Sequence, residues 1–364
     1  MTHLDLAADV TELAKALVDL PSVSGNEDRI ADAVEEALAA CAHLEVIRDG
    51  NAIVARTHLG RAERVAIAGH LDTVPIKGNV PGHWSEDGDV LWGRGSVDMK
   101  AGVAVQLSLA AALTAPTRDI TWIFYDQEEV EAVRNGLGRL VREHPELIEA
   151  DFAVLCEPTQ GVIEGGCNGT LRAEVTVPGR AAHSARAWKG VNAIHRAAPL
   201  LAALAAHEPE THLVDGLEYR EGTNAVGIRG GIAGNVIPDE CVVTVNYRFS
   251  PRWSLEEAQA RLEAVVAGAG LEDFSLRFTD LSGAARPGLD APLAASFADA
   301  VAATGVAAPR AKQGWTDVAR FGDLGIPAVN YGPGDPELAH ADDERCPAEE
   351  IRLCRAGLEA WLTA

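Results

Sequence analysis

The chain has 364 residues and a formal net charge of −23, from 54 acidic and 31 basic residues. This acidic excess argues against binding to nucleic acid or to an anionic membrane, because phosphate contacts need clustered Lys and Arg. No run of 18 or more apolar residues occurs, which argues against a membrane-spanning helix. With 47% hydrophobic residues the chain can bury a substantial core, and its length predicts about two domains.

The first residues and the cysteines bear on the cellular compartment. Residues 1–5 carry an acidic side chain where a secretory signal has basic ones, so we expect no export by that route. Six cysteines in a chain of this length, with no C-x-x-C pair, do not make a disulfide framework. Together these features predict a protein of the reducing cytoplasm.

The N-terminal forty residues have the pattern of two amphipathic helices. Apolar residues recur at helical spacing from Leu6 to Leu20, and Pro21 ends that run. Residues 24–27, Ser-Gly-Asn-Glu, then match a capping box in front of the second apolar pattern. We therefore expect the second helix to start with a Ser24 cap.

Short apolar runs alternate with helical patterns in the next part of the chain. Residues 64–68, 120–125 and 152–155 have the composition of buried strands, and residues 101–113 form a helix of small side chains between the first two. After residue 287 the pattern resumes with a helix at 291–304 and a strand at 328–331. This alternation predicts an α/β domain with a mostly parallel sheet.

A different pattern occupies residues 172–282. Helices and strands of an α+β type are expected there: a strand at 171–177, a helix at 191–206, a glycine-rich segment at 227–234, a strand at 241–249, a helix at 255–267 and a strand at 274–278. This order predicts a compact α+β domain inserted into the first one. The expected domains are therefore residues 1–171 with 283–364, and the insertion 172–282.

Acidic and imidazole side chains follow the predicted strands at the point where each strand ends. In open α/β sheets, ligands bind beyond the carboxyl ends of the strands. Each such acid alone is more often a helix cap. Together they predict a site for zinc or a similar divalent ion, because imidazole and carboxylate without thiolate suit such a metal. These candidates are His70 and Asp72, Asp98, Asp126, Glu128 and Glu129, and Glu157.

Two close pairs within this group have distinct expected roles. His70 and Asp72 are two residues apart, so in extended chain they point the same way and the carboxylate can orient the imidazole. Glu128 and Glu129 are adjacent, so their side chains diverge, and one can bind a metal while the other acts as general base. The alternative for this second pair is a solvated acidic turn.

Two other motifs are weaker than they look, and a third is absent. Gly93-Arg94-Gly95 resembles the start of a dinucleotide-binding fingerprint but lacks the third glycine at the required spacing. Lys100 is followed by Ala101 rather than Ser or Thr, so it is not the lysine of a phosphate-binding loop. The absence of a Gly-x-Ser-x-Gly segment weakens a serine-hydrolase function.

The order of motifs over nearly the whole chain resembles the dinuclear zinc amidohydrolases of the aminoacylase and carboxypeptidase type. The motifs that carry this resemblance are residues 69–75, 93–102, 126–129, 156–159, 179–185 and 338–340. The resemblance implies two zinc ions per subunit, with cobalt or manganese as substitutes, bridged by Asp98. It further implies that His70 and Glu157 complete one metal site and that Glu129 and His340 complete the other.

The same resemblance implies roles for residues that do not bind metal. Glu128 would be the general acid and base, and Asp72 would orient His70. His183 would donate a hydrogen bond to the oxyanion, supplied by the partner subunit of a homodimer that forms through the inserted lid domain. The peptide Asp98–Met99 is expected to be cis.

Segments 234–239, 246–251 and 315–321 are most similar to those of enzymes that remove succinate from N-succinyl-LL-2,6-diaminopimelate, in lysine and diaminopimelate synthesis. A small N-acyl diamino acid is thus the expected substrate. Arg248 is the best candidate for a carboxylate contact, because guanidinium pairs with carboxylate bidentately; the alternative is a surface salt bridge. Further expected hydrogen-bonding residues are Asn235, Thr170 and Thr316.

Other functions stay open at this point. Residues 166–170 contain no arginine, unlike many of these succinyl-removing enzymes, which leaves the acyl group open. A related deacylase acting on acetylornithine, or a dipeptidase, is the main alternative. A catalytically silent protein that only binds metal or ligand is a third. The presence of Glu128 and of all five ligand positions favours an enzyme.

Overall fold

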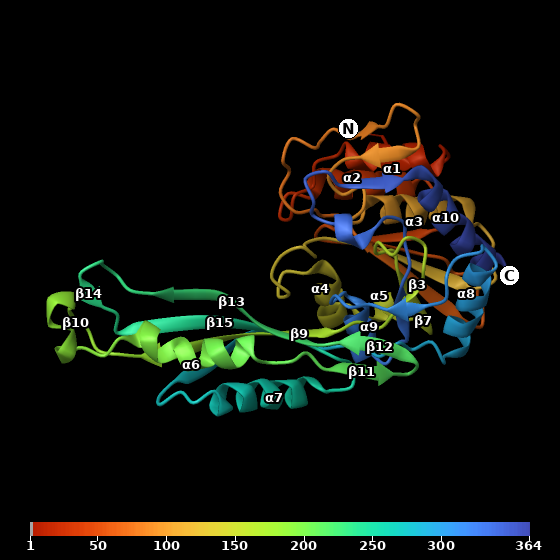
Figure 1. Cartoon of the computed structure of the whole chain (residues 1–364). Helices are drawn as coiled ribbons and strands as arrows, with labels where there is room; N and C mark the ends of the chain where they lie inside the picture. Colours follow the sequence, from red (N-terminus) through yellow and green to blue (C-terminus); the bar gives the residue numbers. More distant parts are fainter. Residues whose placement is uncertain (1–2) are drawn as a thin grey trace. The chain divides into compact units, whose positions relative to one another are not determined.

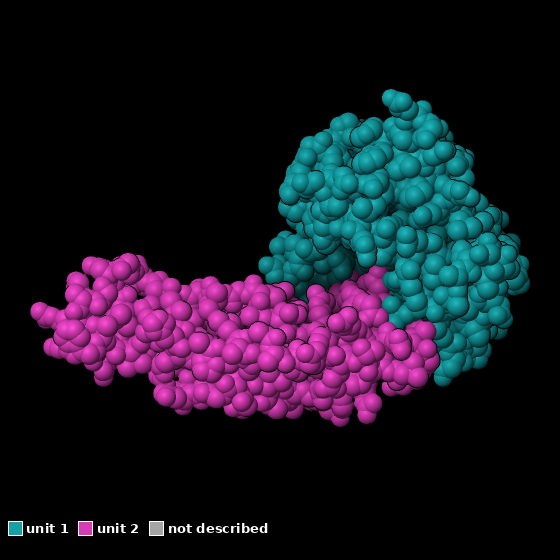
Figure 2. All heavy atoms as spheres, in the orientation of Figure 1, with its two compact units in different colours: residues 1–166, 287–311, 320–364 teal, residues 167–286, 312–319 magenta. Residues whose placement is uncertain are grey.

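The structure is a computed structural model that describes residues 3–364, so the inference drawn from residues 1–5 falls partly outside it. The described residues form two compact units (Figure 2). The first comprises the described residues up to Gly166, with Pro287–Ala311 and Arg320–Ala364. The second comprises Cys167–Arg286 and Lys312–Ala319. The second unit thus contains a short segment, 312–319, that lies outside the predicted insertion 172–282.

A large sheet forms the centre of the first unit (Figure 1). Its strand order is β1-β2-β6-β3-β7-β18-β8-β17. The central strands β6, β3, β7 and β18 run parallel to one another. The pairs β1–β2, β2–β6 and β18–β8 are antiparallel. The predicted α/β class is confirmed. The strands are β1 (Glu45–Asp49), β2 (Ala52–Arg56), β6 (Asp119–Tyr125), β3 (Arg64–His70), β7 (Phe152–Leu155), β18 (Ala328–Asn330), β8 (Glu164–Gly165) and β17 (Arg310–Ala311).

Helices α2, α3 and α5 contact strands of this sheet, while α1 and α8 pack on other helices. In α3, most side chains are small and buried, so the helix can approach the strands closely. A Cβ on Gly102 of α3 would lie 2.1 Å from the carbonyl oxygen of Cys156, so only glycine fits there. The helices outside residues 167–286 are α1 (Val10–Val18), α2 (Asp28–Ala39), α3 (Lys100–Ala112), α4 (Gly136–Glu143), α5 (Pro145–Ile148), α8 (Pro292–Ala302), α9 (Val318–Asp323) and α10 (Ala348–Thr363).

The predicted strands at 64–68, 120–125 and 152–155 are confirmed as β3, β6 and β7. All residues of β6 and β7 are buried, as expected for parallel strands that are covered on both faces. The predicted helix 101–113 is confirmed as α3. A smaller sheet of order β19-β5-β4 joins distant segments, because β19 (Arg345–Pro347) pairs with β5 (Val90–Trp92), which pairs with β4 (His83–Trp84).

The second unit is built on an antiparallel sheet of order β13-β15-β9-β16. Alternate residues of β9 and β15, such as Val175 and Val243, pack with α6 and α7 into a hydrophobic core on one face. The elements are β9 (Gly169–Pro178), β10 (Ala182–His183), the 3-10 helix η1 (Ser184–Lys189), α6 (Ala193–Ala205), β11 (Thr211–Val214), β12 (Leu217–Arg220), β13 (Gly222–Gly230), β14 (Val236–Ile237), β15 (Glu240–Phe249), α7 (Leu255–Gly268) and β16 (Ser275–Ser282).

Two parts of the second unit differ from what the sequence predicts. Part of the glycine-rich segment at 227–234 belongs to the edge strand β13, whose pairing with β15 overrides the low strand propensity of Gly227 and Gly230. The hairpin of β11 and β12 was not predicted, because its strands have only four residues each. Within residues 3–364 the cysteines form no disulfide, and no helix is long and apolar enough to span a membrane.

Asp119, at the start of β6, fixes the loop that leads into β3. Its carboxylate accepts hydrogen bonds from the Thr57 hydroxyl and from the backbone N–H groups of Leu59 and Arg61, each at 2.8 Å. Burial opposes ionisation, but these hydrogen bonds and the charge of Arg64 prevail and lower the pKa of Asp119.

The substitution Asp119→Ala is expected to lower the free energy of unfolding by about 2 kcal/mol at pH 7, because it leaves the buried Thr57 hydroxyl and two part-buried backbone donors without their acceptor. Since the pKa is lowered in the folded state, this stabilisation is present above the unfolded-state pKa of about 3.9 and is lost as the pH falls through the folded value. Urea denaturation of wild type and of Asp119→Ala at pH 7 and pH 3 measures both effects. The gap between the two proteins should shrink at pH 3; a constant gap would contradict this account.

Candidate metal centre

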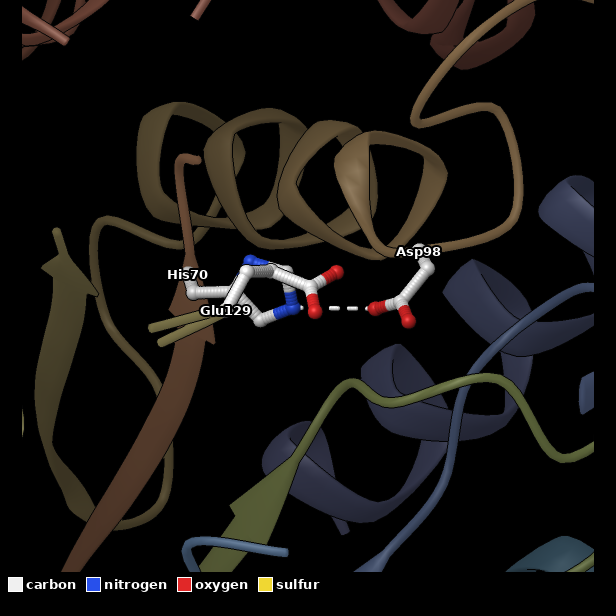
Figure 3. A group of neighbouring side chains, drawn as sticks. All are labelled: His70, Asp98 and Glu129. Carbon is white, nitrogen blue, oxygen red and sulfur yellow. Dashed lines mark hydrogen bonds and ion pairs between the residues drawn. The ribbon is translucent and has the colours of Figure 1, made fainter. Parts of the chain in front are cut away.

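His70 and Asp98 form the centre of the candidate site (Figure 3). His70 is the last residue of β3 and is buried, and Asp98 lies two residues before α3. The His70 Nε2 atom is 2.9 Å from Asp98 Oδ1. The peptide Asp98–Met99 is cis, as the resemblance to the amidohydrolases implies. The end of a central strand and the start of a buried helix therefore bring together two of the predicted ligands.

Glu129 and His340 join this pair. His340 Nε2 lies 2.9 Å from Glu129 Oε1 and 3.3 Å from Asp98 Oδ2, so Asp98 stands between the two imidazoles. His70, Asp98 and Glu129 each offer a ligand atom, and these atoms lie within 4.8 Å of one another. His340 has a φ of 65°, a left-handed conformation that side chains rarely adopt. Its two carboxylate contacts hold the imidazole in this position.

Glu157 lies two residues after β7 and is buried. In the parallel pairing of β3 with β7, Ala68 is opposite Leu155, so His70 and Glu157 each lie two residues beyond the same pair. The close approach of Gly102 to Cys156 also brings the start of α3 next to this strand end. These relations are compatible with a shared site, and the ligand role of Glu157 stays a prediction.

Asp72 holds both the first ligand and the loop that carries Glu128 and Glu129. It is fully buried, and its carboxylate accepts hydrogen bonds from the backbone N–H groups of Glu128 at 2.9 Å and of Glu129 at 3.1 Å. The Nδ1 atom of His70 is 3.0 Å from the Asp72 carbonyl oxygen and 3.5 Å from its Oδ1. Asp72 is thus placed to position the Glu128 backbone as well as the His70 imidazole.

The expected capping box at residues 24–27 is wrong. The Ser24 hydroxyl donates to Asp72 Oδ2 at 2.7 Å instead, and α2 begins at Asp28 without a side-chain cap. Glu27 accepts a hydrogen bond from the backbone of Gly25. The local pattern was misleading because Ser24 has a tertiary partner that lies 48 residues away in the sequence.

Arg94 and Glu344 form a buried ion pair that the sequence did not reveal. Their closest atoms, Arg94 Nη1 and Glu344 Oε2, are 2.8 Å apart, and both side chains are about fully buried. The other carboxylate oxygen, Oε1, accepts hydrogen bonds from the backbone N–H groups of Val97 and Asp98. Glu344 therefore fixes the loop that carries the central aspartate. The only sequence signal was the Gly93-Arg94-Gly95 segment itself.

The electrostatics of the cluster fit a bound cation. Hydrogen bonds to Asp98 and Glu129 raise the pKa of His340 to about 10. Burial opposes protonation of His70, but its bonds to Asp72 and Asp98 prevail and raise its pKa well above the usual value. The carboxylates thus favour a positive charge at both imidazoles. Because a metal-binding histidine must be neutral, a divalent ion would replace these protons, and the imidazole and carboxylate donors suit zinc or a similar ion.

The predicted substrate-contacting residues lie at opposite ends of the second unit's sheet. Thr170 and Arg248 are opposite one another in the pairing of β9 with β15, near the Gly169 end. His183 and Asn235 lie beyond the Pro178 end, where the Ser184 N–H donates to the Asn235 carbonyl. Strands of ten residues separate the two groups by roughly 30 Å. One chain therefore does not bring His183 and Arg248 together within this unit.

The remaining predicted contact, Thr316, is buried in the segment Lys312–Ala319 of the second unit. Its carbonyl accepts a hydrogen bond from the Cys167 thiol at 3.7 Å. The Thr170 hydroxyl accepts one from the Asn246 amide at 3.0 Å. The substrate roles of both threonines stay predictions.

A second group of possible ligands lies in the second unit, at Glu210, His212 and Glu221. Arg261 already binds Glu210 at 2.7 Å. The carboxylate of Glu221 accepts hydrogen bonds from the Tyr247 hydroxyl, the Ser250 N–H and the Trp253 indole. This group is better described as a hydrogen-bonded ion-pair network, since a guanidinium supplies the positive charge that a metal would bring.

The sequence matches the family model described as peptidase family M20/M25/M40 over residues 66–364. It is 52% identical over 349 residues, 96% of each chain, to a putative succinyl-diaminopimelate desuccinylase of Mycobacterium tuberculosis. It is 45% identical over 365 residues to the succinyl-diaminopimelate desuccinylase of Corynebacterium glutamicum, which covers 99% of this chain and 98% of that one. The chain therefore belongs to the peptidase family M20/M25/M40.

Solved structures share this fold. A tripeptidase of Staphylococcus aureus matches with a TM-score of 0.80 at 20% sequence identity, over 98% of this chain and 97% of that one. The YXEP protein of Bacillus subtilis, described as a dinuclear metal-binding peptidase of the M20 family, matches with a TM-score of 0.73 at 17% identity, over 98% of both chains.

Proposed function

We propose that the protein is a zinc-dependent amide hydrolase that removes succinate from N-succinyl-LL-2,6-diaminopimelate. The observation that carries this proposal is the cluster of His70, Asp98, Glu129 and His340 in a chain that is 52% and 45% identical to succinyl-diaminopimelate desuccinylases over nearly its whole length. The unpaired cysteines agree with a reducing cytoplasm, where we place the enzyme.

Two zinc ions would be held by the five predicted ligands, with Asp98 shared between them. When bound, such a metal pair polarises the amide carbonyl and favours ionisation of water near neutral pH. The ligands themselves keep the positions described above: Glu344 fixes the Asp98 loop, and Asp72 fixes the Glu129 backbone. Cobalt or manganese are the alternatives for the same donor set.

Glu128 performs the proton transfers in this proposal. Its carboxylate takes a proton from the attacking water and returns it to the nitrogen of the leaving amine, so one residue serves as base and then as acid. Its backbone N–H is bound to the Asp72 carboxylate, which holds the residue beside the ligand Glu129. His183 donates a hydrogen bond to the oxygen that becomes negative during the reaction.

The test of this function is hydrolysis of N-succinyl-LL-2,6-diaminopimelate, measured as succinate release. N-acetylornithine and a dipeptide serve as competing substrates, and we expect the highest kcat/KM for the succinyl substrate. Treatment with a chelator should abolish activity, and added zinc should restore it. A protein that hydrolyses acetylornithine or the dipeptide better would contradict the proposed substrate. One that keeps full activity without metal would contradict the proposed metal chemistry.

The position of His183 supports a homodimer in which each subunit supplies this residue to its partner. Within one chain, His183 and Arg248 lie at opposite ends of a long sheet. The edge strand β13 also exposes large apolar side chains, Val226 and Ile228, which pairing between two copies would cover. Sedimentation should give a dimer for the wild type, and Ile228→Asp should shift it toward the monomer.

Mixing two inactive variants tests the exchange of His183 directly. In a dimer of one His183→Ala subunit and one Glu128→Ala subunit, one of the two sites keeps both residues if His183 acts on the partner. Random mixing should then restore about a quarter of wild-type activity, because half of the dimers are mixed and each has one intact site. No recovery in a verified mixed dimer would assign His183 to its own subunit.

A further inference from the structure

A cavity of about 520 Å³ lies wholly within the second unit, beside the end of β15 that carries Arg248. Two arginine side chains contribute to its wall, together with hydroxyl and amide groups. Gly222, opposite Arg248 in the pairing of β13 with β15, leaves space beside it, since a Cβ there would meet only the Asn224 amide at 3.6 Å. The lining residues are Asn168, Thr211, Glu218, Arg220, Glu221, Gly222, Arg248 and Gln313.

The backbone of Arg220 is held from both sides by amide side chains of this same wall. The Arg220 carbonyl accepts a hydrogen bond from Asn168 Nδ2 at 2.8 Å, and the Arg220 N–H donates to Gln313 Oε1 at 3.0 Å. Asn168 is buried and also binds the Gln313 carbonyl. Gln313 in turn donates to the carbonyl of Glu218. These hydrogen bonds therefore fix the end of β12 and the backbone position from which the Arg220 side chain extends.

The guanidinium groups of Arg220 and Arg248 have no hydrogen-bond or ion-pair partner among residues 3–364. Some other arginines of this unit do have one: Arg277 binds Glu174 at 2.6 Å, and Arg286 binds Asp215 at 2.6 Å. In a chain with 54 acidic and 31 basic residues, carboxylates are abundant. Both arginines are exposed, so water can solvate each of them. The observation that suits an anionic ligand is that two guanidinium groups without a carboxylate partner line the same cavity.

The two acidic residues of the cavity, Glu218 and Glu221, differ in how far they are available to a ligand. The buried Glu221 already accepts three hydrogen bonds, from Tyr247, Ser250 and Trp253, and belongs to the network around Arg261. Glu218 is exposed and remains available as an acceptor. The cavity thus presents two guanidinium donors and one carboxylate, a combination that suits a carboxylate with a neighbouring ammonium group.

We propose that Arg220 is a specificity-determining residue that, together with Arg248, binds a carboxylate of the substrate in this cavity. The inference rests on the proposed function, since the succinyl-diaminopimelate substrate carries carboxylates that a simple acyl amine lacks. Two of them are remote from the scissile amide: the free carboxylate of the succinyl group and that of the distal amino acid centre. Planar, bidentate pairing explains why arginine, rather than lysine, occupies both positions.

Substrate analogues combined with Arg220→Gln test this proposal. N-succinyl-L-lysine lacks the distal carboxylate, and N-acetyl-diaminopimelate lacks the succinyl carboxylate. In the wild type, kcat/KM for N-succinyl-LL-2,6-diaminopimelate should exceed kcat/KM for the analogue that lacks the bound carboxylate by about 10- to 100-fold. Arg220→Gln should remove this preference in one of the two comparisons. The comparison in which it disappears identifies the carboxylate. Arg286→Gln, which removes the same charge outside the cavity, should keep both preferences.

The proposal would be overturned if Arg220→Gln kept the wild-type preference for the full substrate over each of the two analogues. If wild type hydrolyses no succinyl substrate, the proposed function fails instead. Calorimetric titrations with LL-2,6-diaminopimelate and with succinate, which carry the two candidate carboxylates, then test the cavity by itself. Weaker binding to Arg220→Gln than to wild type and Arg286→Gln supports the cavity. Equal binding to all three proteins, or none to any, overturns it. Thermal unfolding of each variant verifies that the fold is kept.

Discussion

Glu128→Gln is expected to lower kcat for succinate release by about 10²- to 10⁴-fold, the usual contribution of a general acid and base. The substitution keeps the shape of the side chain and the backbone hydrogen bond from residue 128 to Asp72, so the neighbouring Glu129 should stay in place. Metal content per subunit, measured by elemental analysis, should therefore match wild type. Loss of activity without loss of metal separates a proton-transfer role from a ligand role.

Glu131→Gln is the matched control for this experiment. Glu131 lies in the same acidic segment, but its side chain is exposed and pairs with Arg134 at 3.6 Å. Its removal should leave kcat within about twofold, because exposed ion pairs contribute little. If Glu128→Gln retains wild-type turnover, or if both variants lose activity alike, Glu128 is not the base and the segment acts through its overall charge.

The strands and most of the candidate metal centre could be predicted from the sequence, because both depend on short local patterns. Apolar runs fixed the positions of β3, β6 and β7, and parallel strands place their carboxyl ends at one edge of the sheet. His70 is the last residue of β3, and Glu129 and Glu157 lie in the loops that follow β6 and β7. Asp98 and His340 lie in loops. Asp98 was already a candidate among these acids, whereas only the resemblance to the amidohydrolases assigned His340 to the site.

The interactions that hold these ligands could not be predicted, because they join residues far apart in the sequence. The Arg94–Glu344 pair spans 250 residues, and neither residue has a pattern that names the other. Ser24 matched a local capping motif, yet its hydroxyl binds Asp72. Arg220 lies in a hairpin too short to be predicted, so its cavity was also invisible. The residues that hold the ligands of a site in place are thus harder to infer from sequence than the ligands themselves.

Glu344→Ala is expected to lower the free energy of unfolding by about 3–5 kcal/mol, because it leaves the buried Arg94 guanidinium without a counter-charge. The same change frees the backbone N–H groups of Val97 and Asp98, which both donate to Glu344. The Asp98 loop should then lose its fixed position. We therefore expect lower metal occupancy in addition to lower stability, measured by urea denaturation and by elemental analysis of the folded protein.

The double substitution Arg94→Met with Glu344→Met separates these two effects. It removes both buried charges and fills their volume with apolar side chains, so most of the lost stability should return. Metal occupancy should stay low, because methionine cannot accept the hydrogen bonds of Val97 and Asp98. Arg345→Ala, which breaks the exposed pair with Asp343 next in the chain, should cost about 1 kcal/mol or less. Full metal occupancy in the stable double variant would show that Glu344 supports the fold alone and has no part in positioning the Asp98 ligand.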